Sequence, residues 1–193
     1  MEQLKEALSA AGIAYKENEP LCALPIFCAH CTFRIGGPAD LFVLPENEEQ
    51  LCAAIRLAKE AGVRSYLLGN GSNILFEDAG YRGAVINVSA MKSGIGVIEN
   101  ISFPGKDPAL TYDAVVVGAG QMLSSLCMAA LENSLTGLEF AYGIPGTVGG
   151  AVYMNAGAYG GEMKDVLASV RYLTGEGEIV EAPAEQLDLR YRH

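Results

Sequence analysis

The sequence predicts an α+β fold made of two parts. In the first part, short apolar runs typical of strands surround one amphipathic helix. In the second, a strand leads into a helix and then into a glycine-rich stretch. Residues 89–110, which hold several glycines and prolines, lie between the two parts. We therefore expect one α+β subdomain over residues 1–90 and a second over residues 91–193.

The first part contains a helix signal between strand signals. Residues 39–44 (ADLFVL) are apolar and lie between two prolines, which is typical of a buried strand. Asn47 is then a suitable N-cap, and Gly62 a suitable end, for a helix with apolar residues recurring on one face (Leu51, Ile55 and Ala58). Residues 63–68 and 83–88 are further apolar runs. We therefore expect a strand, a helix and two more strands.

The second part has a different order of elements. Residues 114–117 resemble a strand and lead into a helix that ends near Asn133 and has one apolar face (Leu123, Leu126, Cys127, Ala130 and Leu131). After the glycine-rich stretch, residues 166–173 are predicted to form a strand. A turn at residues 175–177 joins it to a second strand at residues 178–181, so we expect a hairpin.

Composition excludes several classes of protein. The chain carries a formal net charge of −10, whereas a nucleic-acid-binding surface needs clustered lysine and arginine. Residues 140–161 carry no charge, but seven glycines and Pro145 argue against a membrane span. Residues 1–12 lack the basic region and apolar run of a signal peptide. We expect a cytoplasmic protein that binds neither nucleic acid nor membranes and holds any anionic ligand through backbone N–H groups.

The five cysteines do not predict a metal site. Cys28 and Cys31 form a CxxC with His30 between them and Cys22 nearby, but no second CxxC or HxxxH completes the four ligands of a structural zinc. A redox CxxC would be expected to open a helix after a strand, whereas this one precedes an apparent strand. We interpret these residues as thiols of a reducing cytosol.

A glycine loop follows the second predicted strand. Residues 67–75 read LLGNGSNIL, and Gly69, Gly71 and Ser72 would let backbone amides approach a phosphate. The loop begins like the dinucleotide motif GxGxxG, but Ile74 replaces the third glycine and no acidic residue follows about 20 positions later. A P-loop is excluded because no Gly-Lys-Ser/Thr follows. A plain glycine turn stays open as the alternative.

The stretch at residues 143–161 (GIPGTVGGAVYMNAGAYGG) is the stronger site signal. Such a density of glycine is poor for a helix or a strand, so we expect the segment to line a ligand. Asn155 offers a donor and an acceptor that suit the edge of a planar heterocycle. Tyr153 and Tyr159 could stack on a ring or bond a phosphate. A buried glycine-rich connection is the alternative.

Four stretches resemble the family of UDP-N-acetylenolpyruvoylglucosamine reductases, in its order and spacing. They are TFRIGGPAD at residues 32–40, LGNGSNIL at 68–75, LTGLEFAYGIPGTVGGAVYMNAGAYGG at 135–161, and Tyr191-Arg192. The resemblance implies an FAD-binding domain of the vanillyl-alcohol oxidase (PCMH) type, built of two α+β subdomains. Cys31 departs from the pattern, because the family usually has a small hydroxyl residue there.

The resemblance also implies an activity. The family uses NADPH and non-covalently bound FAD to reduce UDP-N-acetylglucosamine enolpyruvate to UDP-N-acetylmuramate, in peptidoglycan precursor synthesis. Arg192 would be catalytic, by pairing with the substrate carboxylate beside which negative charge develops. Tyr191 and Tyr159 would bind the UDP-sugar. The residues implied to bind FAD come from both glycine segments (Gly69, Asn70, Gly71, Ser72, Asn73, Ile74, Gly146, Thr147, Gly149, Gly150, Ala151, Asn155, Ala156 and Gly157).

Family members continue into a domain that binds the UDP-sugar and supplies a proton donor and a glutamate. We therefore expect this chain to be a truncated flavin-binding part, inactive alone. Two other functions stay open: another FAD-binding flavoenzyme domain of the same fold, or a non-catalytic flavin-binding module. Many of the former attach flavin to a histidine in the first glycine loop, whereas the only histidines here are His30 and His193. Valine at Gly71 or Gly150 is expected to abolish flavin binding and to harm folding less.

Overall fold

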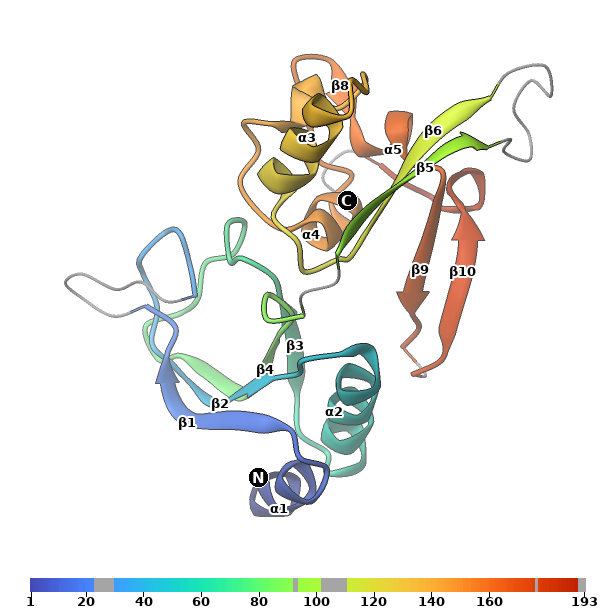
Figure 1. The fold of residues 1–193 in the computed structure, drawn as a ribbon. Coiled ribbons are helices and arrows are strands. Elements are labelled where there is room, and N and C mark those ends of the chain that lie inside the picture. The colour runs from blue at the N-terminus through green and yellow to red at the C-terminus, as the bar shows by residue number, and fades with distance from the viewer. Residues whose placement is uncertain (23–29, 92–93, 102–110, 176, 191–193) are drawn as a thin grey trace. The chain divides into compact units, whose positions relative to one another are not determined.

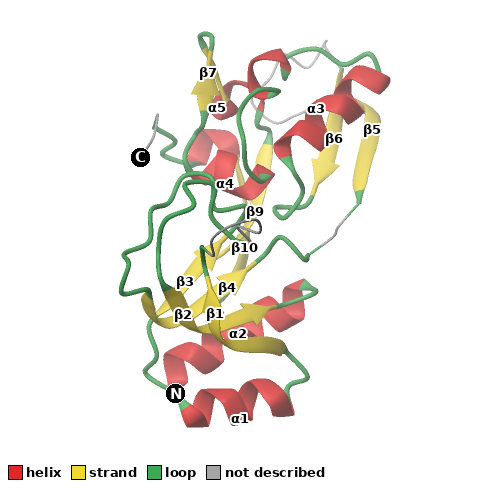
Figure 2. Cartoon of the chain, turned by 90° about the vertical axis from the view of Figure 1, so that its left-hand side faces the viewer, coloured by secondary structure: helices red, strands yellow, loops and turns green. Residues whose placement is uncertain are grey.

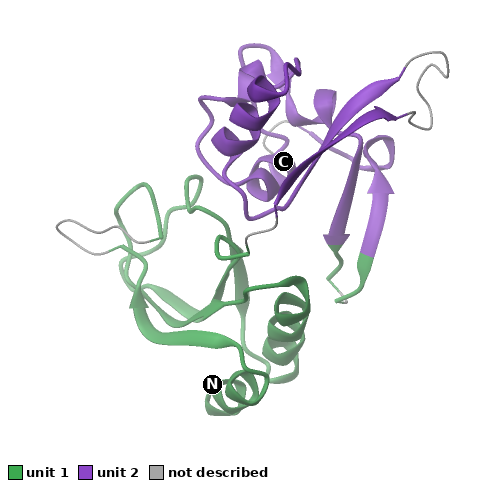
Figure 3. Cartoon of the chain, in the orientation of Figure 1, with its two compact units in different colours: residues 1–92, 173–179 green, residues 93–172, 180–193 purple. Residues whose placement is uncertain are grey.

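The computed structural model describes residues 1–22, 30–91, 94–101, 111–175 and 177–190. They divide into two compact units (Figure 3). Unit 1 comprises Met1–Lys92 and Leu173–Ile179, and unit 2 comprises Ser93–Tyr172 and Val180–His193. Within the described ranges, no helix is both long enough and apolar enough to cross a membrane.

Unit 1 is a four-stranded sheet with two helices packed on one face (Figure 1). Its elements are α1 (Glu2–Ala10), β1 (Ala14–Pro20), β2 (Pro38–Leu44), α2 (Glu48–Glu60), β3 (Ser65–Leu68) and β4 (Tyr81–Asn87). The strand order is β1-β2-β4-β3, with β1 antiparallel to β2 and the other neighbours parallel. Because β3 and β4 are parallel, their carboxyl ends meet at the same end of the sheet.

Alternate side chains of the sheet enter two separate cores, as the pleat requires. Leu41 and Val43 of β2 face the helices and join one core (with Leu4, Leu8, Ala54, Ala58 and Ile86). Phe42 faces the other way and joins the second core (with Leu21, Cys31, Leu68, Phe76 and Val85). The two helices lie together on one side of the strands in Figure 2. The second core contains Leu68, the last residue of β3, and therefore supports the glycine loop that follows.

Local signals predicted most of unit 1 correctly. Asn47 caps α2 as expected, because its side-chain oxygen accepts a hydrogen bond of 2.9 Å from Gln50 N. The three predicted strands are confirmed, with ends that differ by at most two residues. The sequence did not predict β1, whose residues 14–20 (AYKENEP) are mostly polar and lie at the edge of the sheet. An edge strand with exposed side chains carries no hydrophobic alternation to detect.

Unit 2 is built from short elements around a helical core. They are β5 (Ile95–Ile101), β6 (Tyr112–Val117), α3 (Leu123–Glu132), a 3-10 turn η1 (Glu139–Ala141), α4 (Val148–Tyr153), β7 (Gly157–Ala158), β8 (Gly161–Glu162), α5 (Met163–Val166), β9 (Ser169–Leu173), β10 (Ile179–Pro183) and a 3-10 turn η2 (Ala184–Gln186). Strands β5 and β6 pair antiparallel, and β9 pairs with β10 as the expected hairpin. Leu173, which ends β9, and Ile179, which begins β10, belong to unit 1. The core joins one face of α3 to α4 (Leu123, Leu126, Cys127, Val148, Ala151 and Met163).

Two predictions for unit 2 were wrong, and one strand was not predicted. Residues 143–161 were expected to form neither helix nor strand, yet they contain α4, β7 and part of β8. Thr147 supplies the N-cap that starts α4 despite its two glycines. The strand predicted from residue 166 begins at Ser169, because residues 163–166 form α5, which a capping box starts. β5 lies inside residues 89–110 and depends on pairing with β6, which periodicity does not reveal.

Candidate functional site

The first glycine loop, residues 69–73, leaves the carboxyl end of β3. Asn87, the last residue of the neighbouring β4, is buried and donates a hydrogen bond of 2.9 Å from Nδ2 to Gly69 O. Its Oδ1 in turn accepts hydrogen bonds from Ser89 N, at 3.1 Å, and from Ser89 Oγ. The parallel pairing of β3 and β4 therefore brings together a glycine loop and the side chain that fixes its start.

The segment before β2 holds the rest of this loop. Thr32 N donates to Gly71 O at 3.0 Å, and the Cys31 thiol donates to Ile74 O at 3.4 Å. Cys31 is buried in the second core, so its small apolar side chain also fills space there. Cys28, the other member of the CxxC, lies outside the described residues. The carbonyl groups of Gly69, Gly71 and Ile74 are thus all turned toward the protein.

The amide groups of the same loop are oriented differently. Among the residues that the structure describes, none accepts a hydrogen bond from the amides of Asn70, Gly71 or Asn73. Gly71 is buried, and a buried N–H group almost always has a partner in a folded protein. Held carbonyls at Gly69 and Gly71, beside amides of Asn70, Gly71 and Asn73 that no described residue accepts, are the arrangement expected of a backbone nest for an anion.

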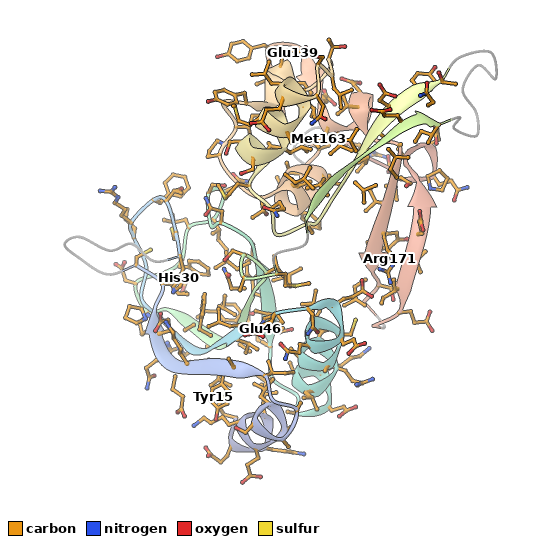
Figure 4. The ribbon with its side chains drawn as sticks, in the orientation of Figure 1. Tyr15, His30, Glu46, Glu139, Met163 and Arg171 are labelled. Carbon is orange, nitrogen blue, oxygen red and sulfur yellow. The ribbon has the colours of Figure 1, made fainter. Side chains whose placement is uncertain are left out.

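Gly71 itself is required by the protein around it. Its φ of +63° lies in the left-handed region, and a Cβ at this position would overlap the backbone oxygen of His30. His30, labelled in Figure 4, is fixed by its own contacts. Its imidazole lies 3.0 Å from Glu19 Oε1, and its ring centroid lies 3.9 Å from that of Phe42. The backbone that closes on Gly71 is therefore anchored to β1 and β2.

The second glycine segment begins with α4, and its helical amides already have acceptors. Val148 N donates to Gln121 O at 2.8 Å, and Gly149 N donates to Ala119 O at 2.9 Å. Gly150 N donates to Thr147 Oγ1 at 3.3 Å, and Ala151 N donates to Thr147 O. In the described part of the chain, the amides of Gly146 and Thr147 have no such acceptor. Among the described residues at this helix start, the first amides of α4 are thus already bonded, and those of Gly146 and Thr147 just before it are the ones left to a ligand.

The two adjacent glycines of α4 have different surroundings. A Cβ on Gly149 would lie 2.7 Å from Ala119 Cβ, so Gly149 is needed for close packing against the loop that joins β6 to α3. Gly150 is exposed, and a Cβ there would meet only Thr147 Oγ1, at 3.3 Å. Of the two, Gly150 has the open face that a ligand could approach.

Asn155 has a structural role in unit 2. It is fully buried, its Nδ2 donates to Glu162 Oε2 at 2.7 Å, and its Oδ1 accepts from Lys164 N at 2.9 Å. Hydrogen bonds from Lys164 and Asn155 lower the pKa of the Glu162 carboxyl below its ordinary value. The side chain therefore ties the end of α4 to β8 and α5. The predicted contact of Asn155 with a flavin ring stays a prediction.

Tyr159 occupies the tip of the hairpin formed by β7 and β8. Its side chain is 98% exposed, and its φ of +52° is unusual for a bulky residue. The two-residue loop Tyr159-Gly160 has positive φ at both positions, as a type I′ hairpin turn requires, so the turn accounts for this conformation. The predicted contact of Tyr159 with the substrate stays a prediction. Tyr153 on α4 is 79% exposed. Tyr191 and Arg192, the other residues predicted to act on the substrate, lie outside the described residues.

Sequence reasoning identified the glycine segments and missed the residues that hold them. Asn87, Thr32 and Ala119 were not predicted as site residues, although each bonds a glycine of one segment. One signal for Asn87 was available, since it is a polar residue within the apolar run GAVINV at residues 83–88. A polar side chain inside a buried strand needs a hydrogen-bond partner.

Similarity to known proteins covers both units. A protein-family model described as an FAD binding domain matches residues 39–183. A UDP-N-acetylenolpyruvoylglucosamine reductase from Agathobacter rectalis is 46% identical over 166 residues, which are 85% of this chain and 52% of that protein. One from Lachnoclostridium phytofermentans is 42% identical over 192 residues, covering 100% of this chain and 56% of that protein. The chain thus spans about half the length of the curated relatives it matches.

Solved structures give the same fold. UDP-N-acetylenolpyruvylglucosamine reductase from Thermus caldophilus matches with a TM-score of 0.62 and 29% identity, covering 93% of this chain and 55% of that one. A VAO-type flavoprotein from Myceliophthora thermophila matches with a TM-score of 0.64, over 88% of this chain and 32% of that one. At 19% identity, the second match shows a shared fold alone. The α+β fold of the vanillyl-alcohol oxidase type, with two α+β subdomains, is confirmed.

Proposed function

Because the chain belongs to the FAD-binding-domain family and corresponds to the FAD-binding part of UDP-N-acetylenolpyruvoylglucosamine reductases, we propose that it supplies the flavin site of such an enzyme. The proposed reaction is the NADPH-dependent reduction of UDP-N-acetylglucosamine enolpyruvate to UDP-N-acetylmuramate. This reaction belongs to peptidoglycan precursor synthesis, and we place it in the cytoplasm. FAD, when bound, would carry the hydride between NADPH and the substrate.

The observation that carries the proposal is how the peptide groups of the first glycine loop are bonded: its carbonyls have partners in the protein, and several of its amides have none among the described residues. Protein donors hold the carbonyls of Gly69, Gly71 and Ile74, while no described residue accepts from the amides of Asn70, Gly71 and Asn73. FAD carries a pyrophosphate, and such a loop suits it even in a chain with a net charge of −10. We propose that these amides of unit 1 bind this pyrophosphate. Separately, we propose that the amides of Gly146 and Thr147 in unit 2 contact FAD.

The proposed roles on the substrate fall to three residues. Arg192 would pair with the substrate carboxylate and stabilise the negative charge that develops beside it, since a guanidinium stays protonated and binds carboxylates with two parallel bonds. Tyr191 and Tyr159 would bind the UDP-sugar. Since the chain spans about half of its relatives, we expect it to bind FAD without turnover of its own.

We expect FAD to be held without a covalent bond. Residues 69–73 contain no histidine, and the imidazole of His30 is already engaged by Glu19 and Phe42. After reconstitution with FAD and denaturation by acid, all of the yellow colour should move to the supernatant. Colour that stayed with the precipitated chain would contradict this expectation, and a chain that bound no FAD would contradict the proposed function.

Gly150→Val is expected to lower FAD affinity with little change in folding stability. The glycine is exposed on α4, and the new Cβ would press only on Thr147 Oγ1, so stability should change by no more than about 1 kcal/mol. FAD affinity should fall roughly tenfold or more, because the branched side chain would occupy the ligand's space. Fluorescence titration with FAD and urea unfolding measure the two effects. Unchanged affinity would show that Gly150 does not contact the cofactor.

A further inference from the structure

Buried polar side chains are rare in the described part of the chain, and each one holds a glycine-rich segment. They are Asn87, Thr147 and Asn155, which are between 0 and 3% exposed. Thr147 caps α4 and Asn155 ties α4 to β8, so both hold the second segment. Of the described residues of unit 1, Asn87 is the one buried polar side chain, and it holds the first loop from the end of β4.

We propose that Asn87 is a positioning residue for the cofactor, which sets FAD affinity by fixing the direction of one peptide group in the loop. The inference rests on the proposed function of that loop. Asn87 would not touch FAD. It would act through the peptide that joins Gly69 to Asn70, whose carbonyl oxygen accepts the 2.9 Å hydrogen bond from Asn87 Nδ2.

Because a peptide group is planar, the hydrogen bond on Gly69 O also fixes the direction of the Asn70 N–H group. The carbonyl of Gly69 and the N–H of Asn70 belong to one rigid, trans peptide plane, in which they point in opposite directions. A donor that holds Gly69 O toward β4 therefore turns Asn70 N–H away from it. Asn70 N is one of the loop amides for which no described residue is an acceptor. The buried amide of Asn87 thus determines where a phosphate-binding N–H points.

The orientation of the Asn87 side chain is itself determined. The atom that faces Ser89 N, at 3.1 Å, must be the oxygen, because a backbone N–H can only donate. Ser89 Oγ bonds the same oxygen. The NH₂ group is then the atom that meets Gly69 O. Asparagine satisfies both neighbours at once, whereas an aspartate would place a second acceptor against the carbonyl of Gly69.

Two substitutions test the proposal in the 193-residue chain, through FAD affinity measured by fluorescence. Asn87→Leu removes the donor without adding charge, and Asn87→Asp replaces the donor by an acceptor. Both should weaken FAD binding roughly ten- to hundredfold at pH 7.5, as for a lost buried hydrogen bond. For Asn87→Asp the affinity should recover as the pH is lowered toward 5, because a protonated carboxyl can donate to Gly69 O. Asn87→Leu should show no such recovery.

Ile86→Val is the matched control. Ile86 is the preceding residue of β4, is 1% exposed, and packs in the core under the helices, on the other face of the sheet. Its truncation should lower stability modestly and leave FAD affinity unchanged. If the wild-type chain bound FAD and both Asn87 variants bound it equally well, the inference would be overturned. The inference would also be overturned if, across all three variants, FAD affinity fell in proportion to the stability measured by urea unfolding. A wild-type chain that bound no FAD would instead overturn the proposed function.

Discussion

Arg192→Ala is expected to slow substrate reduction by roughly a hundred- to a thousandfold in a version of the protein extended to the full length of its relatives. In its proposed role, the Arg192 guanidinium would stabilise charge that develops beside the substrate carboxylate only as the reaction proceeds, so its loss should lower the reaction rate. Reduction of the flavin by NADPH should change much less, because no such charge develops on a substrate in that half-reaction. Rapid-mixing absorbance measurements separate the two.

Two further substitutions sharpen this test. Arg192→Lys should recover only part of the rate, since an ammonium supplies charge without the two-pronged geometry. Arg190→Ala is a matched control two residues away: Arg190 is exposed and its guanidinium bonds Asp188 at 2.8 and 3.0 Å. It should leave both half-reactions unchanged. Slowing of the NADPH half-reaction alone in Arg192→Ala would show that Arg192 contacts the nucleotide and not the substrate.

Gly71→Val is expected to abolish FAD binding and to destabilise unit 1 by roughly 3 kcal/mol or more. The side chain would have to adopt a φ of +63° and would overlap the backbone of His30, so the loop could not keep its conformation. The sequence alone predicted that folding would suffer less than affinity. The structure gives a physical reason to expect that Gly71→Val loses both FAD affinity and stability. Of the two substitutions, only Gly150→Val should lower FAD affinity while leaving stability nearly unchanged.

Gly62→Val provides the control for backbone strain. Gly62 has nearly the same φ, +64°, but a Cβ there would meet nothing within 4 Å. This substitution should cost only the strain of the left-handed conformation, about 1–3 kcal/mol, and should not change FAD affinity. Urea unfolding and FAD titration of both variants give the comparison. Equal losses of stability would show that crowding by His30 contributes nothing at Gly71.

The sequence determined those features whose cause lies within a few residues. The cap of α2 depends on Asn47 and Gln50, three residues apart, and the apolar strands of unit 1 carry their pattern in consecutive residues. The two glycine segments also stand out by composition alone, and through them the resemblance to a flavoenzyme family. These features needed no knowledge of which segments meet in space.

The tertiary structure alone decided how the glycine segments are held. Gly69 is bonded by a residue 18 positions away, Gly71 by one 39 positions away, and Ile74 by one 43 positions away. Likewise, α4 forms among glycines because Thr147 caps it and the loop before α3 accepts its first amides. A hydrogen bond between distant residues leaves no periodic trace in either segment. The sequence therefore indicated which segments to propose as the phosphate site, and the fold decided which of their carbonyl groups are bonded to the protein.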